Sequence, residues 1–315
     1  MDKRFTHLSV MAEVAPPLVG TDPDGTYVDA TFGRGGHSRR ILSLLSSKGK
    51  LIAFDRDPQA IESAKEIMDD RFTIIHAPFS RMREELALRG VQSVHGVFMD
   101  IGVSSPQIDD ASRGFSYRMD GPLDMRMDTS CGETAAQWLA KASEEEIARV
   151  IHTLGEERFA KRIARIIVQT RSQVPIETTQ QLAQLVAQVV PANKKDPTQN
   201  PATRTFQAIR IHINSELDEL SLALNAAMQL VDDEGRIGVI TFHSLEDRIV
   251  KRFFDEKAHP EKALDSRLPL RADQLPQPEL KDIKRVLPDQ EECNANPRAR
   301  SAILRLATRV HAGRL

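Results

Sequence analysis

A glycine-rich turn between two acids is the first group of residues in this chain that could do chemistry. Residues 28–37 read Val-Asp-Ala-Thr-Phe-Gly-Arg-Gly-Gly-His, and the apolar run 51–54 ends at Asp55. Glycines let backbone N–H groups approach a ligand closely, and an acid about 20 residues further on can accept hydrogen bonds from a ribose diol. The pattern indicates a nucleoside-binding half-domain.

The first of these acids separates two classes of nucleoside ligand. A dinucleotide site has G-x-G-x-x-G directly after the strand and binds pyrophosphate at a helix N-terminus. Here Asp29 precedes Gly33, Gly35 and Gly36, and a carboxylate at that place repels pyrophosphate but suits an ammonium group or hydroxyls. The segment resembles the first motif of the class I methyltransferases, with Thr31 where many have glycine. A turn with only a structural role is the alternative.

A second acidic strand end suggests how a substrate amine is held. Residues 97–107 read Val-Phe-Met-Asp-Ile-Gly-Val-Ser-Ser-Pro-Gln, so Asp100 is followed by a turn with Ser104, Ser105 and Pro106. Enzymes that methylate exocyclic amines have a similar segment, usually with two prolines and an aromatic residue. The amino nitrogen of cytosine or adenine is a poor nucleophile, and acceptors on its hydrogens can direct its lone pair toward a methyl donor. We therefore expect these four residues to orient an amine.

Alternating apolar runs and helical patterns predict the framework that positions these residues. Strands are expected at residues 26–30, 50–54, 73–76, 94–99, 236–242 and 301–308. Helices are expected at residues 37–47, 58–69, 80–89, 215–231 and 245–254. This alternation predicts a parallel sheet with helices on both faces.

The alternation is interrupted in the middle of the chain. Residues 103–134 have no sustained period and are typical of a long functional loop, and the helical spacing that follows contains no convincing strand. Helix starts are expected at Ser143 and at Thr178 or Thr179. We predict a doubly wound α/β domain formed by residues 1–109 and 210–315, with an all-helical insertion at 110–209 for recognition of RNA or another substrate.

Composition excludes several classes of protein. The 315 residues are 40% hydrophobic and 28% charged. They contain no apolar run of the roughly 20 residues that a membrane span needs. Residues 1–7 lack the apolar core of a signal peptide, and two cysteines cannot form a disulfide framework. A reducing cytoplasm is therefore expected.

Clusters of basic residues favour a polyanionic partner, although the net charge is only −2. Residues 141–210 contain eleven Lys and Arg against seven acids, and residues 293–315 contain five arginines and no acid. The residues expected to contact RNA phosphates are Arg204, Arg210, Arg298 and Arg300. Arg298 and Arg300, two apart on a strand, would face the same side. A salt bridge to a nearby carboxylate such as Glu246 or Asp247 is the alternative.

Four segments of the chain are similar to one family and span nearly its whole length. They resemble the bacterial 16S ribosomal RNA cytosine-N4 methyltransferases, the small-subunit methyltransferase H family. The segments are Asp29–Ser38, Asp100–Asp109, Asn200–Asn214 with Phe242–Lys251, and Asn296–Ser301. The resemblance implies a class I, Rossmann-like methyltransferase fold with a helical insertion. It also implies S-adenosylmethionine as methyl donor and a decoding-centre cytidine of the small ribosomal subunit as acceptor.

The resemblance also implies the cofactor contacts. It places them on Gly35, Gly36, His37, Asp55, Phe79, Asp100 and Gln107, to which the turn itself adds Asp29 and Gly33. Backbone groups from Gly35 to His37 would meet the amino-acid part of the cofactor. Asp55 would hold the ribose hydroxyls, and Phe79 would lie by the adenine. A helix start without chemistry is the alternative for His37.

Two further observations limit the mechanism. The spacing of His243, Glu246 and Asp247 could suggest a metal site. A helix cap formed by Ser244 with Asp247 explains the same spacing, and methyl transfer to an amine needs no metal. Neither cysteine follows a proline, as the nucleophile of carbon-5 methyltransferases does. We therefore expect no metal and a direct in-line transfer. An amine methyltransferase for DNA or a small molecule, and a non-catalytic ribosome-assembly protein, are the alternatives, and the oligomeric state stays open.

Overall fold

The computed structural model describes residues 9–191, 200–264, 271 and 274–310 of the chain. No helix in these ranges is both long enough and apolar enough to cross a membrane.

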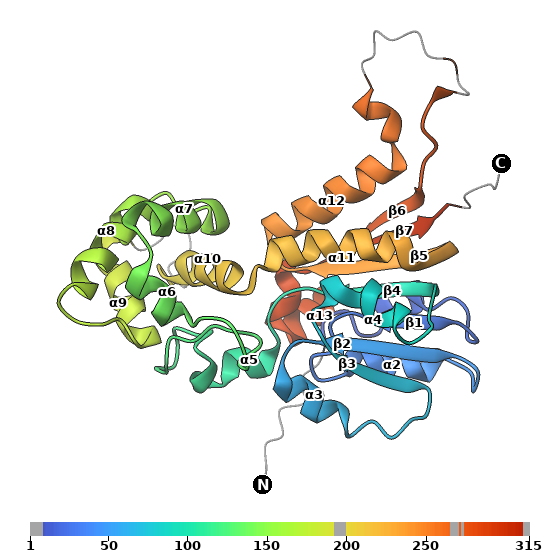
Figure 1. Ribbon diagram of the computed structural model, residues 1–315, viewed down its shortest axis with the longest axis horizontal. Helices are drawn as coiled ribbons and strands as arrows, with labels where there is room; N and C mark the ends of the chain where they lie inside the picture. The colour runs from blue at the N-terminus through green and yellow to red at the C-terminus, as the bar shows by residue number, and fades with distance from the viewer. Residues whose placement is uncertain (1–8, 192–199, 265–270, 272–273, 311–315) are drawn as a thin grey trace. The chain divides into compact units, whose positions relative to one another are not determined.

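The chain divides into two compact units, each of which is described by itself (Figure 1). The sheet unit consists of Met1–Gly102 and Leu217–Leu315, and the helical unit is Val103–Glu216. The helical unit is thus one continuous insertion, and it is longer at both ends than the range 110–209 expected from the sequence.

The sheet unit is built on seven strands in the order β3-β2-β1-β4-β5-β7-β6. Their bounds are β1 Thr26–Asp29, β2 Lys50–Asp55, β3 Phe72–His76, β4 Val94–Asp100, β5 Val231–Thr241, β6 Leu280–Val286 and β7 Ile303–Arg309. Strands β1 to β5 pair in parallel, and β7 is antiparallel to both β5 and β6. The strand order reverses direction between β1 and β4, and open α/β sheets bind ligands at the carboxyl edge beside such a point.

Six of these strands lie where the apolar runs predict them, because strands buried on both faces are nearly continuous apolar runs. The polar stretch 259–290 gave no prediction of β6. The strand lies at the edge of the sheet, where four of its seven residues are exposed and only Leu280 is buried. β5 begins at Val231, earlier than the predicted residue 236.

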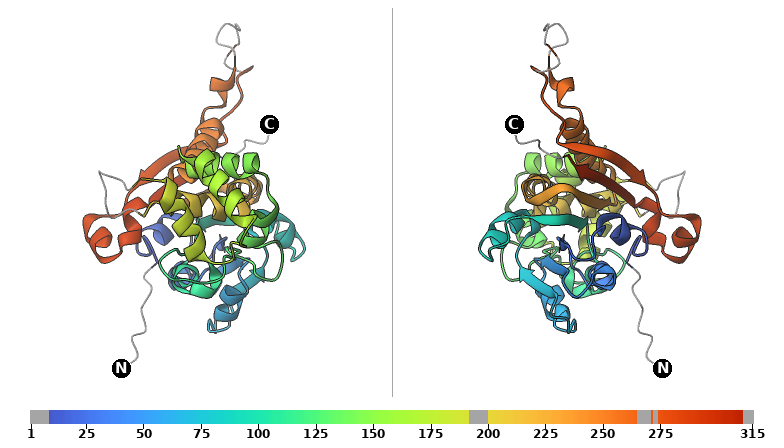
Figure 2. Two further views of the ribbon diagram at one scale, coloured as in Figure 1. Left: turned by 90° about the vertical axis from the view of Figure 1, so that its left-hand side faces the viewer. Right: turned by 90° about the vertical axis from the view of Figure 1, so that its right-hand side faces the viewer.

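Helices of the sheet unit flank the sheet. They are α1 Ala15–Val19, α2 Gly36–Leu44, α3 Pro58–Ala64, α4 Met82–Ala87, α11 Glu216–Leu230, α12 Ser244–Ala258 and α13 Gln290–Ala295. Short 3-10 turns are η1 Phe79–Arg81, η3 Pro260–Ala263 and η5 Pro297–Ser301. α12 packs beside β6 and β7 at one end of the sheet (Figure 2). α3 begins with Pro58 after the N-cap Asp57, whose side chain accepts a hydrogen bond from the backbone N–H of Gln59.

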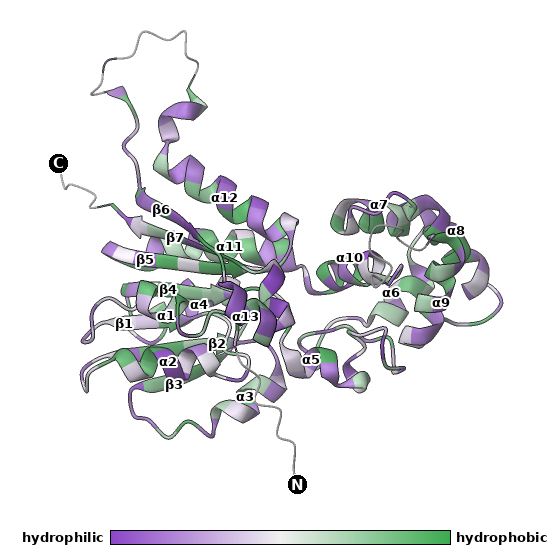
Figure 3. Cartoon of the chain, turned by 180° about the vertical axis from the view of Figure 1, so that it is seen from behind, coloured by the Kyte–Doolittle hydropathy of each residue, from purple (hydrophilic) through white to green (hydrophobic). Residues whose placement is uncertain are grey.

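The helical unit contains the rest of the described helices, with polar and apolar residues on each (Figure 3). They are α5 Ser105–Asp109, α6 Ala135–Lys141, α7 Glu144–Gly155, α8 Ala160–Arg171, α9 Thr179–Val189 and α10 Thr203–Asn214, with a 3-10 turn η2 at Ala111–Arg113. Ser143 and Thr178 are the N-caps of α7 and α9, as their positions predict. Apart from an isolated bridge between Pro122 and Thr178, the described residues of this unit form no strand.

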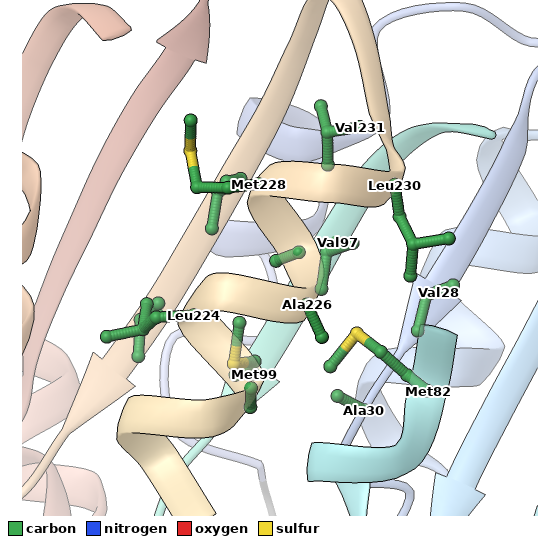
Figure 4. Packing of buried hydrophobic residues seen from close by; sticks show 14 of the residues in the cluster. Val28, Ala30, Met82, Val97, Met99, Leu224, Ala226, Met228, Leu230 and Val231 are labelled. Carbon is green, nitrogen blue, oxygen red and sulfur yellow. The ribbon is translucent and has the colours of Figure 1, made fainter. Parts of the chain in front are cut away.

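Alternate residues of the central strands face two separate apolar clusters. Val28 on β1 and Met99 on β4 pack in one cluster with Leu224 of α11 (Figure 4). The preceding residues, Tyr27 and Phe98, belong to the other cluster, which includes residues of α1 and α2. Because side chains alternate along a strand, each face of the sheet is covered by one of these apolar clusters. The polar residues that end the strands lie at the edge of the sheet.

Candidate active site

Three carboxylates come from the carboxyl ends of three adjacent parallel strands. Asp29 ends β1, Asp55 ends β2 and Asp100 ends β4. In the sheet register, Asp29 lies opposite Ala53 of β2 and Phe98 of β4. The chain therefore brings residues from three separate motifs to the edge where the strand order reverses.

Asp29 is fully buried and links the ends of two strands to α2. Its Oδ2 accepts a hydrogen bond of 2.6 Å from the hydroxyl of Ser38, and its Oδ1 accepts one of 3.1 Å from the backbone N–H of Thr31. The Thr31 hydroxyl in turn accepts a bond of 2.6 Å from the backbone N–H of Asp100. Burial raises the pKa of Asp29, and the bond from Ser38 opposes the rise. In this arrangement Asp29 holds the neighbouring backbone in place through Ser38 and Thr31.

Asp100 keeps one carboxylate oxygen without a hydrogen-bond partner in the described chain. Its Oδ1 is buried and unbonded, and its Oδ2 lies 3.6 Å from Nδ1 of His37. The side chain as a whole is 24% exposed. Burial raises the pKa of Asp100 to about 6, and the nearby His37 opposes that rise. An unbonded buried acceptor is costly in a folded protein unless a ligand uses it.

Asp55 is half-buried and already fixes the glycine turn. Its Oδ2 accepts a hydrogen bond of 2.7 Å from the backbone N–H of Gly33, and its Oδ1 accepts one of 2.8 Å from that of Asp57. Burial raises the pKa of Asp55 to about 6, and these bonds oppose the rise. A carboxylate oxygen can accept more than one hydrogen bond, so Asp55 can still accept from a hydroxyl.

The glycines of the turn are needed for different reasons. Gly33 and Gly35 have positive φ angles of 57° and 75°, which favour glycine. No atom of the described chain lies within 4 Å of a Cβ built on Gly33, whereas a Cβ on Gly36 would lie 2.0 Å from the Ser9 hydroxyl. Gly35 is also the N-cap of α2, so N–H groups of the first turn of α2 have no acceptor within the helix.

These features fit S-adenosylmethionine. Backbone N–H groups at the start of α2 can bind a carboxylate, Asp55 can bind hydroxyls, and the unbonded Oδ1 of Asp100 can accept from an ammonium group or an amine. Space over Gly33 lets a ligand approach the backbone. Phe79, half-buried where η1 follows β3, packs against the cluster that contains Val28.

The turn expected to orient an amine belongs to the helical unit. Ser104 is the N-cap of α5, Ser105 and Pro106 begin the helix, and all three are partly exposed. The backbone N–H of Ser104 donates a hydrogen bond of 2.9 Å to Oε1 of Gln107, whose side chain is buried. Gln107, expected to contact the cofactor, thus stabilises the start of α5.

Two of the arginines expected to contact RNA lie on α10. Arg210 is mostly buried and makes two hydrogen bonds to Glu216, of 2.8 and 2.9 Å. Arg204 is exposed, and its guanidinium donates to the backbone carbonyl of Glu156. The ion pair restricts Arg210, whereas most of Arg204 faces solvent.

The placement of Arg298 and Arg300 on a strand is wrong. Both lie in the 3-10 turn η5, which has three residues per turn, so residues two apart point in different directions. Arg298 is half-buried and Arg300 is exposed. The carboxylate of Asp247 pairs instead with Arg305, through hydrogen bonds of 2.6 and 2.9 Å.

The predicted cap of α12 is also wrong. The residues that form the cap instead, a half-buried histidine and a buried glutamate, are absent from the predicted set of site residues. The N-cap is His243 rather than Ser244, and Glu246 completes a capping box. Glu246 is fully buried, accepts a hydrogen bond of 2.8 Å from the backbone N–H of Phe242, and lies 3.0 Å from Nε2 of His243. Its charge contributes to the raised pKa of Asp100. The His-x-x-Glu spacing after a strand was the available signal.

Comparison with known proteins agrees with this geometry. The chain matches the MraW methylase family over residues 4–310. It is similar to the Ribosomal RNA small subunit methyltransferase H of Burkholderia cenocepacia (strain HI2424), with 55% identity over 314 residues that cover 98% of this chain and 99% of that protein. The protein of the same name from Burkholderia vietnamiensis (strain G4 / LMG 22486) is 54% identical over the same shares of the two chains.

The family match and the fold lead to the same assignment. The mixed α/β sheet confirms the class I, Rossmann-like methyltransferase fold expected from the sequence. A methylase on this fold takes its methyl group from S-adenosylmethionine, so the expected cofactor is confirmed. The chain belongs to the MraW methylase family.

Proposed function

We propose that this methyltransferase acts on 16S ribosomal RNA of the small subunit, at the N4 amine of a decoding-centre cytidine. The names of its relatives support ribosomal RNA of the small subunit as the substrate. The free acceptor on Asp100 supports an amine, because Oδ1 has no hydrogen-bond partner in the described chain and lies at the edge where ligands of this fold bind.

The proposed reaction is a direct in-line transfer without a covalent enzyme–base adduct. S-adenosylmethionine, when bound, supplies an electrophilic methyl group. Asp100 accepts a hydrogen bond from the cytidine amine, which reduces the delocalisation of the nitrogen lone pair into the ring. The turn of Ser104, Ser105 and Pro106, which follows Asp100 in the chain, completes the orientation of the amine.

The proposed cofactor contacts divide into direct and supporting residues. Backbone groups of the turn, with Gly33, Gly35, Gly36 and His37, and the side chains of Asp55, Phe79, Asp100 and Gln107 make the direct contacts. Asp29 supports them through Ser38 and Thr31, because its own carboxylate is fully buried and hydrogen-bonded to both.

The helical unit is proposed to bind the RNA backbone. Near the start of α8, Arg158, Lys161 and Arg162 are exposed and form no ion pair with any described residue. The guanidinium carbons of Arg158 and Arg162 lie 4.7 and 5.7 Å from the ring centroid of Phe159. Like charges held near one ring repel each other, and a phosphate between them relieves that repulsion. With the exposed Arg204, this cluster supports phosphate contacts better than Arg210 does.

The RNA contact is tested by the salt dependence of binding. Replacing Arg158 and Arg162 together with glutamine removes up to two phosphate contacts, so the slope of log affinity against log salt falls by about two at most. Arg165→Gln is the matched control, since that exposed arginine of the same helix pairs with Glu144 at 3.7 Å. An unchanged slope in the double variant would remove the cluster from the RNA interface.

The substrate is tested by offering labelled S-adenosylmethionine to purified small subunits, free 16S RNA and DNA. Mass spectrometry of the digested product is expected to give N4-methylcytidine at one decoding-centre position. Asp100→Asn is expected to abolish transfer, and Asp22→Asn, an exposed acid of the same unit, is expected to leave it unchanged. Label in DNA would establish a different substrate, and cofactor binding without transfer to any RNA would favour an assembly protein.

A further inference from the structure

His37 is a buried histidine between groups that fix the positions of its protons. Its side chain is 5% exposed, and its ring centroid lies 4.7 Å from that of Phe98. Nε2 lies 2.8 Å from the backbone carbonyl oxygen of Val10, and Nδ1 lies 3.6 Å from Oδ2 of Asp100. Each ring nitrogen therefore faces an oxygen.

The contact with Val10 determines the tautomer. A carbonyl oxygen can only accept a hydrogen bond, so Nε2 of His37 carries a proton. If His37 were neutral, Nδ1 would then carry only its lone pair, and that lone pair would face the Asp100 carboxylate. Two electron-rich atoms at that distance repel each other in a buried site. An additional proton, on Nδ1 or on Oδ2, turns the repulsion into attraction.

The surrounding charges favour keeping that proton. From β1, the carboxylate of Asp29 interacts with His37, and from α12, the carboxylate of Glu246 faces Asp100. Arg298, on η5, is the positive group that acts on Asp100 besides His37 itself. Glu246 itself lies 3.0 Å from Nε2 of His243. Three carboxylates thus lie among two histidines and one arginine, and removing a proton from the His37–Asp100 pair would add a further negative charge to this cluster.

We propose that His37 is a positioning residue, which holds Asp100 in an ion pair, with Nδ1 protonated and facing Oδ2 at neutral pH. The proton secures one oxygen of the carboxylate and leaves Oδ1 as the acceptor for a ligand. The consequence for catalysis rests on the proposed function: a carboxylate beside an imidazolium is a weak base. Asp100 therefore orients the cytidine amine, and the amine proton released after methyl transfer leaves to water.

The proton is tested in the full-length protein without any variant. Nitrogen-15 shifts of the histidine side chains distinguish an imidazolium from either neutral tautomer, and the carbon-13 shift of the Asp100 carboxyl reports its protonation. At pH 7 we expect one proton beyond the Nε2 proton in the His37–Asp100 pair. A neutral His37 beside an ionised Asp100 at pH 7 would overturn the inference.

Variants then test the pairing. Asp100→Asn is expected to move the nitrogen-15 shift of Nδ1 of His37 at pH 7 toward that of a neutral ring, since the neighbouring charge is gone. Asp22→Asn is the control, because Asp22 lies 3.8 Å from Nε2 of another histidine, His95, and should shift only the signal of His95. Equal shifts of His37 in both variants would contradict the pairing.

Ligand binding separates positioning from simple structural support. His37→Gln keeps a group that can donate to Val10 but has no ionisable proton. It is expected to bind S-adenosylhomocysteine more weakly, and its affinity should change less with pH around neutrality than the wild-type affinity does. Weaker binding with the wild-type pH dependence would overturn the positioning role. If the pair holds its proton but no cytidine is methylated, the inference stands and the proposed function fails.

Discussion

Replacing single glycines by alanine distinguishes backbone strain from contact with the ligand. Gly33 and Gly90 have φ angles of 57° and 73°, and no described atom lies within 4 Å of a Cβ built on either. A left-handed backbone costs a residue other than glycine about 1–2 kcal/mol, so Gly33→Ala and Gly90→Ala should each reduce the free energy of unfolding by that amount. Gly90 lies after α4, away from the acidic strand ends, and serves as the control.

Gly35→Ala carries a second cost. Its Cβ would lie 2.7 Å from the ring of Phe32, which is buried, and its φ angle of 75° adds the same strain. Forcing a methyl group into a packed site costs about 1–3 kcal/mol, so the total loss is about 2–5 kcal/mol. Urea unfolding should therefore place Gly35→Ala well below Gly33→Ala in stability.

Ligand binding separates Gly33→Ala from Gly90→Ala, which are expected to lose the same stability. At Gly33 the new methyl group occupies the open space over the turn, and an overlap of about 1–3 kcal/mol with the ligand weakens binding about fivefold to 140-fold. Titration calorimetry with S-adenosylhomocysteine measures this loss, and Gly90→Ala should bind as wild type does. Wild-type affinity in Gly33→Ala would show that the ligand does not approach this turn, and the reasoning about the open space would be refuted.

Two further predictions concern charged groups. Arg210→Met should destabilise the helical unit by about 3–5 kcal/mol in chemical unfolding, because it leaves the buried Glu216 without its partner. Arg204 is exposed, so Arg204→Met should change the stability by less than about 0.5 kcal/mol. Burial raises the pKa of Asp55 to about 6, so between about pH 4 and 6 the folded state binds a proton that the unfolded state has released. The free energy of unfolding should therefore decrease as the pH rises through this window, by at most about 3 kcal/mol. Asp55→Asn should remove that part of the pH dependence, and an unchanged slope between pH 4 and 6 would contradict it.

The sequence predicts the central sheet well because buried strands appear as continuous runs of apolar residues. Strands covered on both faces need apolar residues at nearly every position, and six such runs are visible without any structure. β6 lacks this signal, since it pairs on one side only and exposes Ile283 and three charged residues. An edge strand forms by pairing with a neighbouring strand that is distant in the sequence, and the local residue pattern does not predict that pairing.

The arginines illustrate the same limit for the site. Arg210 pairs with Glu216 six residues away, and Arg305 pairs with Asp247 from another part of the chain. Neither spacing follows a helical or strand period, so no local rule separates these structural arginines from cations that are open to solvent. Counting basic residues predicts the charge of a segment, and only the fold shows which of these charges are neutralised.

Asp29 and Asp100 demonstrate why the roles of two similar residues could not be separated from the sequence. Both are aspartates at the carboxyl ends of neighbouring strands, and both were expected to meet the ligand. Asp29 is buried, and the hydroxyl of Ser38 in α2 and the backbone N–H of Thr31 in the turn before α2 satisfy its two oxygens, so its charge is used within the protein. Asp100 has one oxygen near His37 and one without a partner, so only Asp100 has an acceptor left for chemistry. The difference depends on which side chains approach each carboxylate from distant turns, and it makes Asp29 a residue that shapes the site and Asp100 a residue that can act in it.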